Sequence, residues 1–328
     1  MDIVLSGMRP TGNLHIGHLK GVLENWVELQ EKYRCFYFIA DWHAITTEYD
    51  NVTAIKENTL EIIAEWLASG LDPEKSTLFV QSQVKEHAEL HLILSMITPI
   101  SWLERVPSYK ELKAQLKKDL NTYGFLGYPV LQAADIIIYK ARYVPVGEDQ
   151  VPHIELTREI VRRFHYIFKK EIFVEPQELI NRAARVRGLD GRKMSKSYNN
   201  AIYLSDPPEV VKEKIMNAVT DPARVRRHDP GHPEVCNVFH YHSLFSSKEE
   251  VEEIEKNCRA GTIGCVECKR KLFEKIESVL APIREKREDY LKRKDDLIDI
   301  IRTGTSKARK VASKTMEEVR EAVSLLDL

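Results

Sequence analysis

Strand-like runs and helical patterns alternate through the first two hundred residues of this 328-residue chain, and this alternation most constrains its fold. Short runs rich in β-branched and aromatic residues predict strands at 2–6, 35–40, 77–80 and 144–147. Between them, apolar residues recur at helical spacing, as at 51–69, where Asn51 is a candidate N-terminal cap. Strands that alternate with helices pair in parallel, so we predict an α/β domain with a doubly wound parallel sheet.

The pattern changes after residue 200. From Pro207 onward nearly all of the chain has helical spacing, interrupted at 221–236, where prolines and a glycine require a loop. We therefore predict a boundary near residue 200, between an α/β domain at 1–200 and a helical domain at 201–328.

Composition and charge exclude several classes of protein. No apolar run approaches the roughly 20 residues of a membrane-spanning helix, and the N-terminus lacks the features of a secretory signal, so we expect a cytoplasmic protein without a membrane partner. With 49 basic and 50 acidic residues, a surface coated in nucleic acid is not expected, although basic runs at 224–227, 269–271 and 307–310 could form a local positive stripe. Charged residues make up 30% of the chain, a high fraction that weakly favours a thermophilic source.

The loop after the first predicted strand, residues 6–21, has neither of the common glycine-rich nucleotide fingerprints. It instead places Thr11, His15 and His18 where a loop enters a helix, and helix N-termini attract anions. Two histidines three residues apart share a helical face and can donate to phosphate oxygens, while Gly17 lets a base or sugar approach the backbone. The alternative is an ordinary helix start with two exposed histidines.

A second polar segment lies at the predicted boundary, at 188–202. Its basic residues Arg192, Lys193 and Lys196 stand among glycine, serine and asparagine. This composition suits a mobile clamp on polyphosphate, because lysines supply charge and backbone N–H groups supply donors. The alternative is a solvated linker.

Together the two segments are more specific than either alone. His-Ile-Gly-His at 15–18 and Lys-Met-Ser-Lys-Ser at 193–197 resemble the paired motifs of class I aminoacyl-tRNA synthetases, in the order and spacing of the tryptophanyl/tyrosyl branch. Residues 41–46, 128–139 and 144–164 resemble the tryptophanyl-tRNA synthetases, and the resemblance extends through 306–323. Two residues depart from the pattern: Arg9 stands where many bacterial relatives carry Gln, and Gln132 where several carry Met. The second keeps a tyrosyl-tRNA synthetase as an alternative.

The resemblance implies a reaction in two steps. The tryptophan carboxylate attacks the α-phosphate of ATP, giving tryptophanyl-adenylate and pyrophosphate, and tRNA(Trp) then takes the aminoacyl group. The nucleophile belongs to the substrate, so catalysis consists of alignment and charge stabilisation. His15 and His18 would serve the α-phosphate, and Lys193 and Lys196 would close on pyrophosphate together with Mg²⁺. The residues expected to bind ATP are Arg9, Pro10, Thr11, Gly17, His18, Gly147, Glu148, Asp149, Val186, Lys193, Met194, Ser195, Lys196 and Ser197.

The amino-acid pocket must recognise an indole, whose one polar group is an N–H donor, so it needs a fixed acceptor. Asp135 is the candidate, because it is a carboxylate in an otherwise apolar run. Tyr128 and Gln132 precede it by seven and three residues, which places all three on one side of a helix. His43 and Gln150 are further candidates for the amino group or the ring. The alternative for Asp135 is a buried carboxylate that caps a neighbouring helix.

Four of the five cysteines gather in the C-terminal part, as C-x21-C-x6-C-x2-C. Clustered thiols in a cytosolic chain suggest metal or redox chemistry. Structural zinc usually uses two short knuckles, whereas the C-x6-C-x2-C core resembles the [4Fe–4S] loop of certain DNA-repair glycosylases and of a subset of tryptophanyl-tRNA synthetases. We favour [4Fe–4S] over Zn²⁺ or unligated thiols, as a staple for the loop at 236–268. The candidate ligands are Cys236, Cys258, Cys265 and Cys268.

By the same resemblance the helical domain reads the anticodon and the protein is a homodimer. Two other classes stay open: a nucleotidyltransferase that adenylates a small molecule without tRNA, and a catalytically silent tRNA-binding relative. The intact phosphate motifs argue against the second, and the long helical domain argues against the first.

Overall fold

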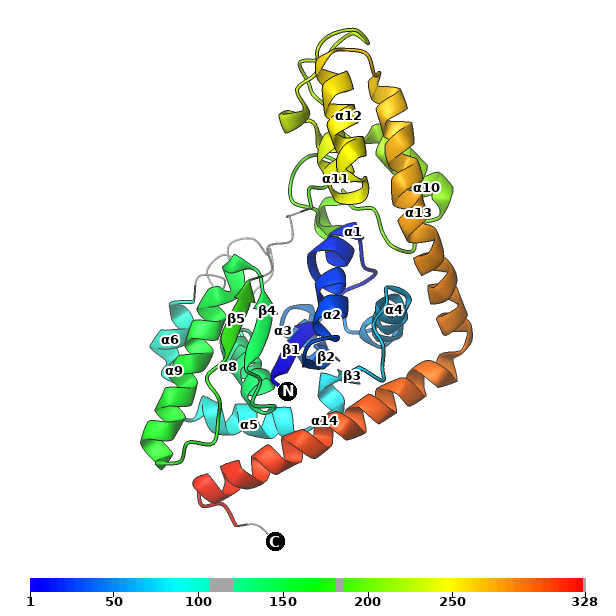
Figure 1. Ribbon diagram of the computed structural model, residues 1–328. Helices are drawn as coiled ribbons and strands as arrows, with labels where there is room; N and C mark the ends of the chain where they lie inside the picture. The colour runs from blue at the N-terminus through cyan, green and yellow to red at the C-terminus, as the bar shows by residue number, and fades with distance from the viewer. Residues whose placement is uncertain (107–120, 181–185, 327–328) are drawn as a thin grey trace.

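The computed structural model describes residues 1–106, 121–180 and 186–326, without the side chain of Ser197. At its centre is a five-stranded sheet in the order β3-β2-β1-β4-β5, with every neighbouring pair parallel (Figure 1). The strands are β1 (Ile3–Met8), β2 (Arg34–Ile39), β3 (Ser76–Val80), β4 (Tyr143–Val146) and β5 (Gln177–Ile180). The predicted parallel α/β fold is confirmed.

Sequence patterns predicted the first four strands but missed β5. Gln177 and Ile180 are exposed and the two residues between them are half-buried, because this strand pairs with β4 at the edge of the sheet. A short edge strand of polar composition has no apolar run to reveal it.

Helices cover both faces of the sheet. They are α1 (Ile16–His18), which continues through a π-helical turn, η1 (Leu19–Leu23), into α2 (Glu24–Leu29), then α3 (Asp41–Glu48), α4 (Ile55–Ala68), α5 (Glu86–Ser95), α6 (Ile100–Glu104), α8 (Tyr123–Ile137) and α9 (Val151–Phe168). The predicted cap of the helix at 51–69 was wrong. Asn51 donates its backbone N–H to Glu48 in the turn after α3, and α4 begins four residues later without a side-chain cap.

Alternate residues of each strand feed two separate cores. Tyr37 and Leu78 pack with α2 and α4 on one face, whereas Phe36 and Phe79 pack with α5, α8 and α9 on the other. Since both faces are covered, the strands read as nearly continuous apolar runs, which is what made them recognisable in the sequence.

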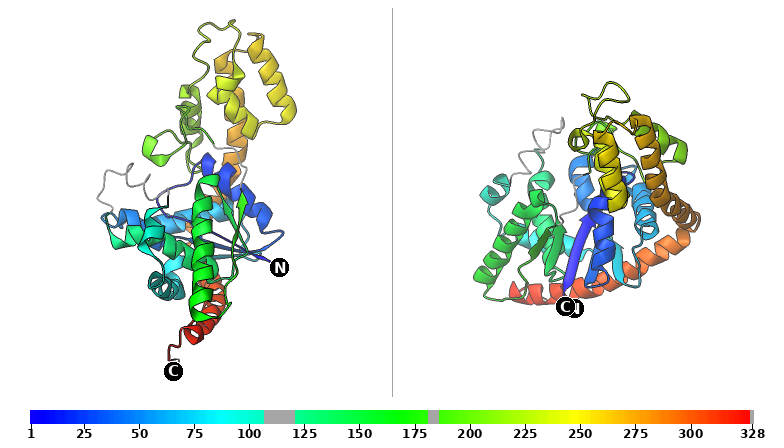
Figure 2. Two further views of the ribbon diagram at one scale, coloured as in Figure 1. Left: turned by 90° about the vertical axis from the view of Figure 1, so that its left-hand side faces the viewer. Right: turned by 45° about the horizontal axis from the view of Figure 1, so that its top comes forward.

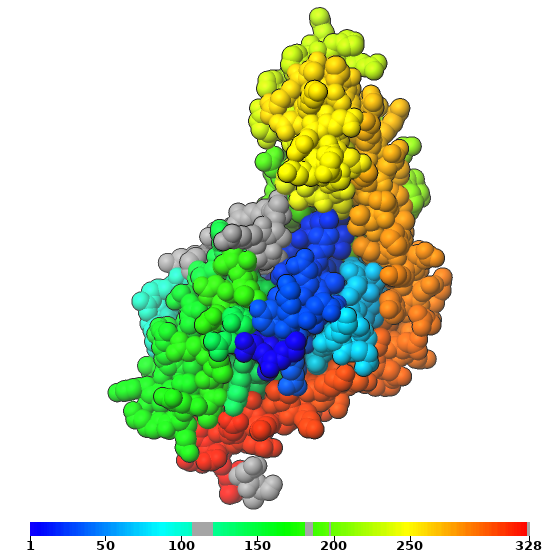
Figure 3. Space-filling view, viewed as in Figure 1, coloured from blue at the N-terminus to red at the C-terminus, as the bar shows by residue number. Residues whose placement is uncertain are grey.

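The C-terminal part is helical, as predicted, but it does not pack as one body. Its helices are α10 (Pro208–Asn217), α11 (Asn237–Phe245), α12 (Lys248–Arg259), α13 (Cys265–Lys292) and α14 (Lys294–Ala322). The first three and the start of α13 form a lobe above the sheet domain, while α13 runs down its side and α14 crosses beneath it (Figures 1 and 2). Figure 3 shows this lobe standing above the wider body of the molecule. The split at residue 200 thus separates α14 in sequence from the sheet it packs against in space.

Gly304 explains how α14 comes so close to the sheet. A Cβ at this position would lie 1.8 Å from the carbonyl oxygen of Leu78 in β3, a backbone atom that no side-chain rotation can move. Farther along α14, the residues Ala308, Ala312 and Met316 are fully buried in the core shared with α5 and α8. Helix and strand therefore meet backbone to backbone at Gly304.

We expect Gly304→Ala to lower the free energy of unfolding by about 3 kcal/mol, because the added methyl must push α14 off β3. Chemical unfolding followed by circular dichroism measures the effect. Gly124→Ala is the matched control: it lies within α8 and nothing stands within 4 Å of the added methyl, so stability should hold or rise slightly. Equal stability of the two variants would contradict the close contact.

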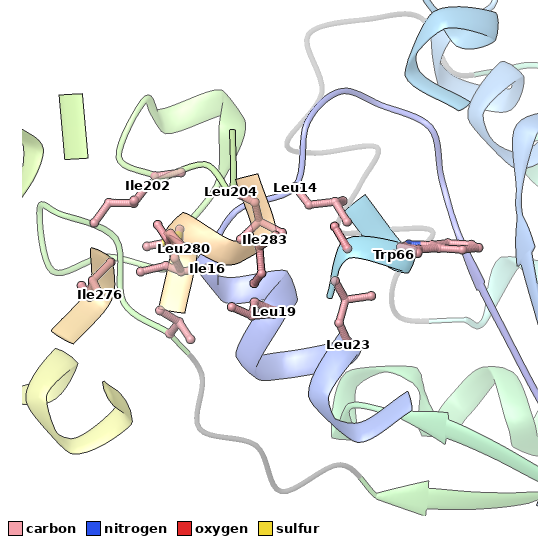
Figure 4. Packing of buried hydrophobic residues seen from close by; sticks show 14 of the residues in the cluster. Leu14, Ile16, Leu19, Leu23, Trp66, Ile202, Leu204, Ile276, Leu280 and Ile283 are labelled. Atoms are coloured by element: carbon pink, nitrogen blue, oxygen red, sulfur yellow. The ribbon is translucent and has the colours of Figure 1, made fainter. Parts of the chain in front are cut away.

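An apolar cluster ties the two phosphate motifs to α13. Leu14, Ile16 and Leu19, in or beside the first motif, lie in one apolar cluster with Ile202 and Leu204, which follow the second (Figure 4). Ile276, Leu280 and Ile283 of α13 close the cluster from the side of the lobe. The middle part of α13 therefore packs against the residues that carry or flank both motifs.

Candidate functional site

A pocket of about 520 Å³ opens at the carboxyl ends of β1 and β4, beside helices α3 and α8. This is where the strand order reverses, which is the usual ligand position in an open α/β sheet. The pocket brings together nine residues that the sequence analysis singled out: Arg9, Thr11, His18, His43, Tyr128, Gln132, Asp135, Gly147 and Gln150.

The histidines of the first motif are fixed at the start of α1. Nδ1 of His15 accepts the backbone N–H of Gly17, and Nδ1 of His18 accepts that of His15, each over 3.1 Å. The two rings lie 3.8 Å apart between centroids. Because Nδ1 is an acceptor in both, the proton of each neutral ring sits on Nε2, and each ring offers one N–H donor.

Both histidines are neutral at physiological pH. Burial and the charge of Lys196 lower the pKa of His15 to about 4. Burial, His15 and Lys196 hold the pKa of His18 well below its usual value. The pair therefore supplies hydrogen-bond donors rather than positive charge.

Asn200 shapes the second motif. Its side chain accepts the backbone N–H of Ser195 at 2.9 Å and donates to the carbonyl of Lys193 at 3.1 Å and to Asp190 at 2.8 Å. A Cβ on Gly188 would lie 2.1 Å from the Asn200 amide nitrogen, so glycine makes room for it. The loop is thus built around one buried amide rather than left as a linker.

The second motif lies against the first. Lys196 donates to the carbonyl oxygen of Gly12, and the Met194 sulfur is 3.6 Å from where a Cβ on Gly17 would stand. Burial lowers the pKa of Lys196 to about 8, against the opposing effect of Glu65. Lys193 is exposed at the edge of this loop. The chain therefore places Lys196 beside the loop that leads into the helix start carrying His15.

Asp135 lies in the wall of the pocket and is 1% exposed. Its carboxylate accepts from His43 Nε2 at 2.8 Å, His87 Nδ1 at 2.6 Å, and Gln81 Nε2 at 2.8 and 2.9 Å. Burial by itself raises the pKa of the Asp135 carboxyl, but the hydrogen bonds from His43 and His87 outweigh it and bring the pKa down to about 2. The charged acceptor is kept ionised by its neighbours.

Other pocket residues escaped the sequence analysis. Phe125 and His153 line the pocket with Tyr128, whose hydroxyl lies 3.3 Å from His153 Nε2. Arg9 donates to Thr47 on α3, which fixes the guanidinium over the pocket. Phe125 stands three residues before Tyr128, so the helical spacing that selected Tyr128 could also have selected it.

Several of the residues expected to bind the nucleotide do not line this pocket. The carbonyl of Pro10 accepts from Asn58, and Gln150 donates to Asp149 in the turn after β4. The backbone of Ser197 lies in the short 3-10 turn Lys196–Tyr198, and its side chain is outside the described part. The expected residues that do not line the pocket are Pro10, His15, Gly17, Glu148, Asp149, Val186, Lys193, Met194, Ser195 and Lys196.

The four clustered cysteines come from the ends of three helices in the lobe. Cys236 precedes α11, Cys258 is in the last turn of α12, and Cys265 and Cys268 occupy the first turn of α13. Burial and the other three thiols raise the pKa of Cys268 to about 12. Among the described residues, however, no group of three or more His, Cys, Asp or Glu side chains is arranged to hold a metal ion.

The three basic runs do not form one stripe. Residues 224–227 and 269–271 lie in the lobe, whereas 307–310 lie on α14 at the opposite end of the molecule (Figure 1). A single stripe through all three is therefore ruled out.

Comparison with known proteins decides the family. The model of the class I tRNA synthetases for W and Y matches residues 2–281. A tryptophan–tRNA ligase of Thermotoga maritima is 57% identical, covering 98% of this chain and 99% of its own, and one of Aquifex aeolicus is 47% identical with the same coverage. The chain belongs to the tryptophan–tRNA ligases. It is therefore an aminoacyl-tRNA synthetase.

Solved structures agree with this assignment. The tryptophanyl-tRNA synthetase of Campylobacter jejuni, complexed with ADP and tryptophan, superposes with a TM-score of 0.90 at 38% identity, covering 98% of this chain and all of that one. A tyrosyl-tRNA synthetase of Archaeoglobus fulgidus, at 21% identity and a TM-score of 0.68, shares the fold alone. The tyrosyl alternative is thus not supported. Across the described residues, no helix is long and apolar enough to span a bilayer.

Proposed function

We propose that the enzyme activates L-tryptophan with ATP in the pocket at the end of β1 and transfers it to tRNA(Trp). The observation that carries this proposal is the buried, ionised carboxylate of Asp135 in an otherwise largely apolar wall, next to the two phosphate motifs. Indole offers one N–H donor on a flat apolar body, and such a wall complements it.

In the first step the tryptophan carboxylate attacks the α-phosphorus of ATP and pyrophosphate leaves. Nε2–H of His15 and His18 would donate to the phosphate oxygens, and Lys193 and Lys196 would neutralise the departing pyrophosphate. Mg²⁺ would enter with ATP as a further counter-charge. The nucleotide would lie along the remaining predicted contacts, Arg9, Pro10, Thr11, Gly17, Gly147, Glu148, Asp149, Val186, Met194, Ser195 and Ser197.

Tryptophan would lie deeper in the pocket, between β1 and α8. Tyr128 and Gln132 share one face of α8 with Asp135, and all three line the pocket. His43 approaches from α3 and Gln150 from the turn after β4, where the substrate amino group could meet them. Each of these assignments rests on position and chemistry.

The test is ATP–pyrophosphate exchange with each of the twenty amino acids, followed by charging of tRNA. We expect exchange with tryptophan alone and charging of tRNA(Trp). Exchange without charging would instead favour an adenylating nucleotidyltransferase. The absence of both activities would favour a silent tRNA-binding relative.

The pKa of Lys196 predicts a pH dependence. A lysine with a pKa of about 8 in the free enzyme loses its charge as pH rises through that value, so kcat/KM for ATP should fall above pH 8. Arginine stays charged throughout this range, so Lys196→Arg, although slower, should lose the fall. The measurement is a pH profile of pyrophosphate exchange from pH 6 to 10. The same fall in both proteins would assign it to another group.

The protein is further proposed to be a cytoplasmic homodimer. Leu92, Met96, Ile100 and Tyr123 are all more than half exposed, and they belong to α5, α6, α8 and the turn between α5 and α6. Because α5 and α6 both pack against α8, these exposed apolar side chains are the candidates for the dimer surface. The anticodon arm would meet the lobe, where runs 224–227 and 269–271 supply positive charge.

The four cysteines are proposed to hold a [4Fe–4S] cluster, with Zn²⁺ as the alternative. Cys236 and Cys265 help to raise the pKa of Cys258, and both of them together with Cys258 help to raise that of Cys268, so the four thiols lie near one another. Four cysteine sulfurs around one tetrahedral zinc would lie about 3.8 Å from one another, because each Zn–S bond is about 2.3 Å long. The sulfurs that bind the four irons of a [4Fe–4S] cluster lie farther apart. Gly231 leaves space at Cys258, since a Cβ there would lie 2.5 Å from its sulfur. Bound iron would join the loop before α11 to the start of α13.

Anaerobic purification with metal analysis and visible absorption should give about four irons per chain and a brown chromophore. Cys265→Ser should then weaken tRNA charging far more than pyrophosphate exchange, because no residue of the lobe lines the pocket. One stoichiometric zinc would select the alternative, and equal losses in both activities would contradict a role confined to tRNA. Cys35→Ser is the control, since Cys35 is buried in strand β2 of the sheet, away from the lobe.

A further inference from the structure

His87 is a fully buried histidine on α5 that the chemistry above does not use. It does not line the pocket, yet its Nδ1 is 2.6 Å from Oδ1 of Asp135 and its Nε2 is 2.7 Å from the hydroxyl of Tyr139. His87 and Tyr139 are 0% exposed. A buried imidazole with both nitrogens engaged forms part of a specified polar network rather than of the apolar core.

The chemistry of the partners sets the direction of these hydrogen bonds. An ionised carboxylate only accepts, so Nδ1 of His87 must donate to Asp135. In the neutral ring Nε2 is then an acceptor, and the Tyr139 hydroxyl donates to it. Tyr139 thereby fixes the tautomer that His87 needs in order to donate to Asp135.

The four contacts of Asp135 are shared two and two between its oxygens, but the donors to each oxygen differ in their position relative to the pocket. Oδ1 accepts from His87 and Gln81, both of which are fully buried and outside the pocket lining. Oδ2 accepts from Gln81 and from His43, and His43 lines the pocket with 12% of its side chain exposed. One oxygen is therefore anchored from behind, and the other meets the pocket.

We propose that His87 is a positioning residue for tryptophan recognition: by holding Oδ1 from behind, it aims Oδ2 of Asp135 at the indole N–H. The proposal rests on the function proposed above, in which Asp135 accepts that N–H. His87 does not touch the substrate. It fixes the carboxylate plane, and hydrogen bonds lose strength steeply when their angle departs from linearity.

The test compares tryptophan with β-(3-benzothienyl)-alanine, which replaces the indole N–H by sulfur and keeps the shape of the ring. The ratio of their kcat/KM values in pyrophosphate exchange reports the N–H contact. His87→Gln removes the donor at the Nδ1 position, and we expect the ratio to fall about tenfold. His87→Asn places an amide donor near the Nδ1 position and should recover most of the ratio. The KM for ATP should stay unchanged in both.

If His87 were merely structural, its substitution would lower kcat/KM for both substrates by the same factor and leave their ratio unchanged. That result would overturn the proposal. If both His87 variants melt below the assay temperature, Tyr139→Phe takes their place. This change removes one hydroxyl, frees the tautomer of His87, and should lower the ratio about threefold; an unchanged ratio there would also overturn the proposal.

Asp135→Ala separates this inference from the function beneath it. If Asp135 accepts the indole N–H, its replacement by alanine should bring the ratio of the two kcat/KM values close to one, because the two ring systems then differ little for the enzyme. If Asp135→Ala keeps the full ratio, the proposed recognition fails. If Asp135→Ala loses it and His87→Gln keeps it, the recognition stands and the role of His87 fails.

Discussion

Asp135→Ala should lower kcat/KM for tryptophan by about 30- to 1,000-fold and leave the KM for ATP nearly unchanged. Loss of a buried hydrogen bond to a charged acceptor costs about 2–4 kcal/mol, which corresponds to this range. We expect the effect on kcat/KM for tryptophan and not on the KM for ATP, because Asp135 lies in the pocket wall on α8. The second phosphate motif, at 193–197, follows β5 in sequence and lies against the first motif.

The measurement is pyrophosphate exchange with tryptophan and ATP varied separately. Asp135→Asn is the matched variant, because it keeps the volume and an acceptor oxygen but loses the charge, so its activity should lie between wild type and the alanine variant. Because Asp135 also anchors His43, His87 and Gln81, thermal unfolding of each variant separates lost recognition from lost folding. Near-normal tryptophan kinetics in a folded alanine variant would refute the assignment.

Lys193→Ala and Lys196→Ala should each lower the rate of adenylate formation by about 100- to 1,000-fold, with a smaller change in substrate affinity. A contact that strengthens only as pyrophosphate separates raises kcat without tightening the ground state. Lys196 already reaches the carbonyl of Gly12, so it is poised beside the start of α1, where the phosphates would lie.

Rapid-quench single-turnover activation with saturating substrates measures this rate directly. Arg192→Ala is the matched control in the same loop, because Arg192 is exposed and hydrogen bonded to Asp190 rather than directed at the first motif. Its rate should be close to that of wild type. Wild-type single-turnover rates in both lysine variants would make the loop structural.

Patterns that depend on neighbours in sequence predicted the framework of this enzyme well. Buried parallel strands contribute continuous apolar runs, so the sequence predicts β1 to β4, and the two phosphate motifs indicate the family from the sequence alone. The edge strand β5 and the start of α4 were missed or misplaced, because a half-exposed strand and a helix without a side-chain cap leave weak local signals.

The recognition site was predictable only in part. Asp135, Tyr128 and Gln132 share one helix, so their common face follows from helical spacing alone. Gln81 and His87 reach the same carboxylate from separate elements, 54 and 48 residues away along the chain, and no periodicity links them to it. Sequence identified the acceptor, and tertiary packing decided what holds it ionised.

The sequence by itself determined the sheet, the motifs and the residue types that the chemistry requires, since each depends on local spacing. Only the tertiary structure decided that α14 returns beneath the sheet, that the Asn200 side chain holds the backbone of the second motif, and that His87 contacts Asp135 from outside the pocket. These contacts join residues distant in the chain. They arise because burying apolar faces forces particular elements together, and the buried polar groups carried with them must then find partners.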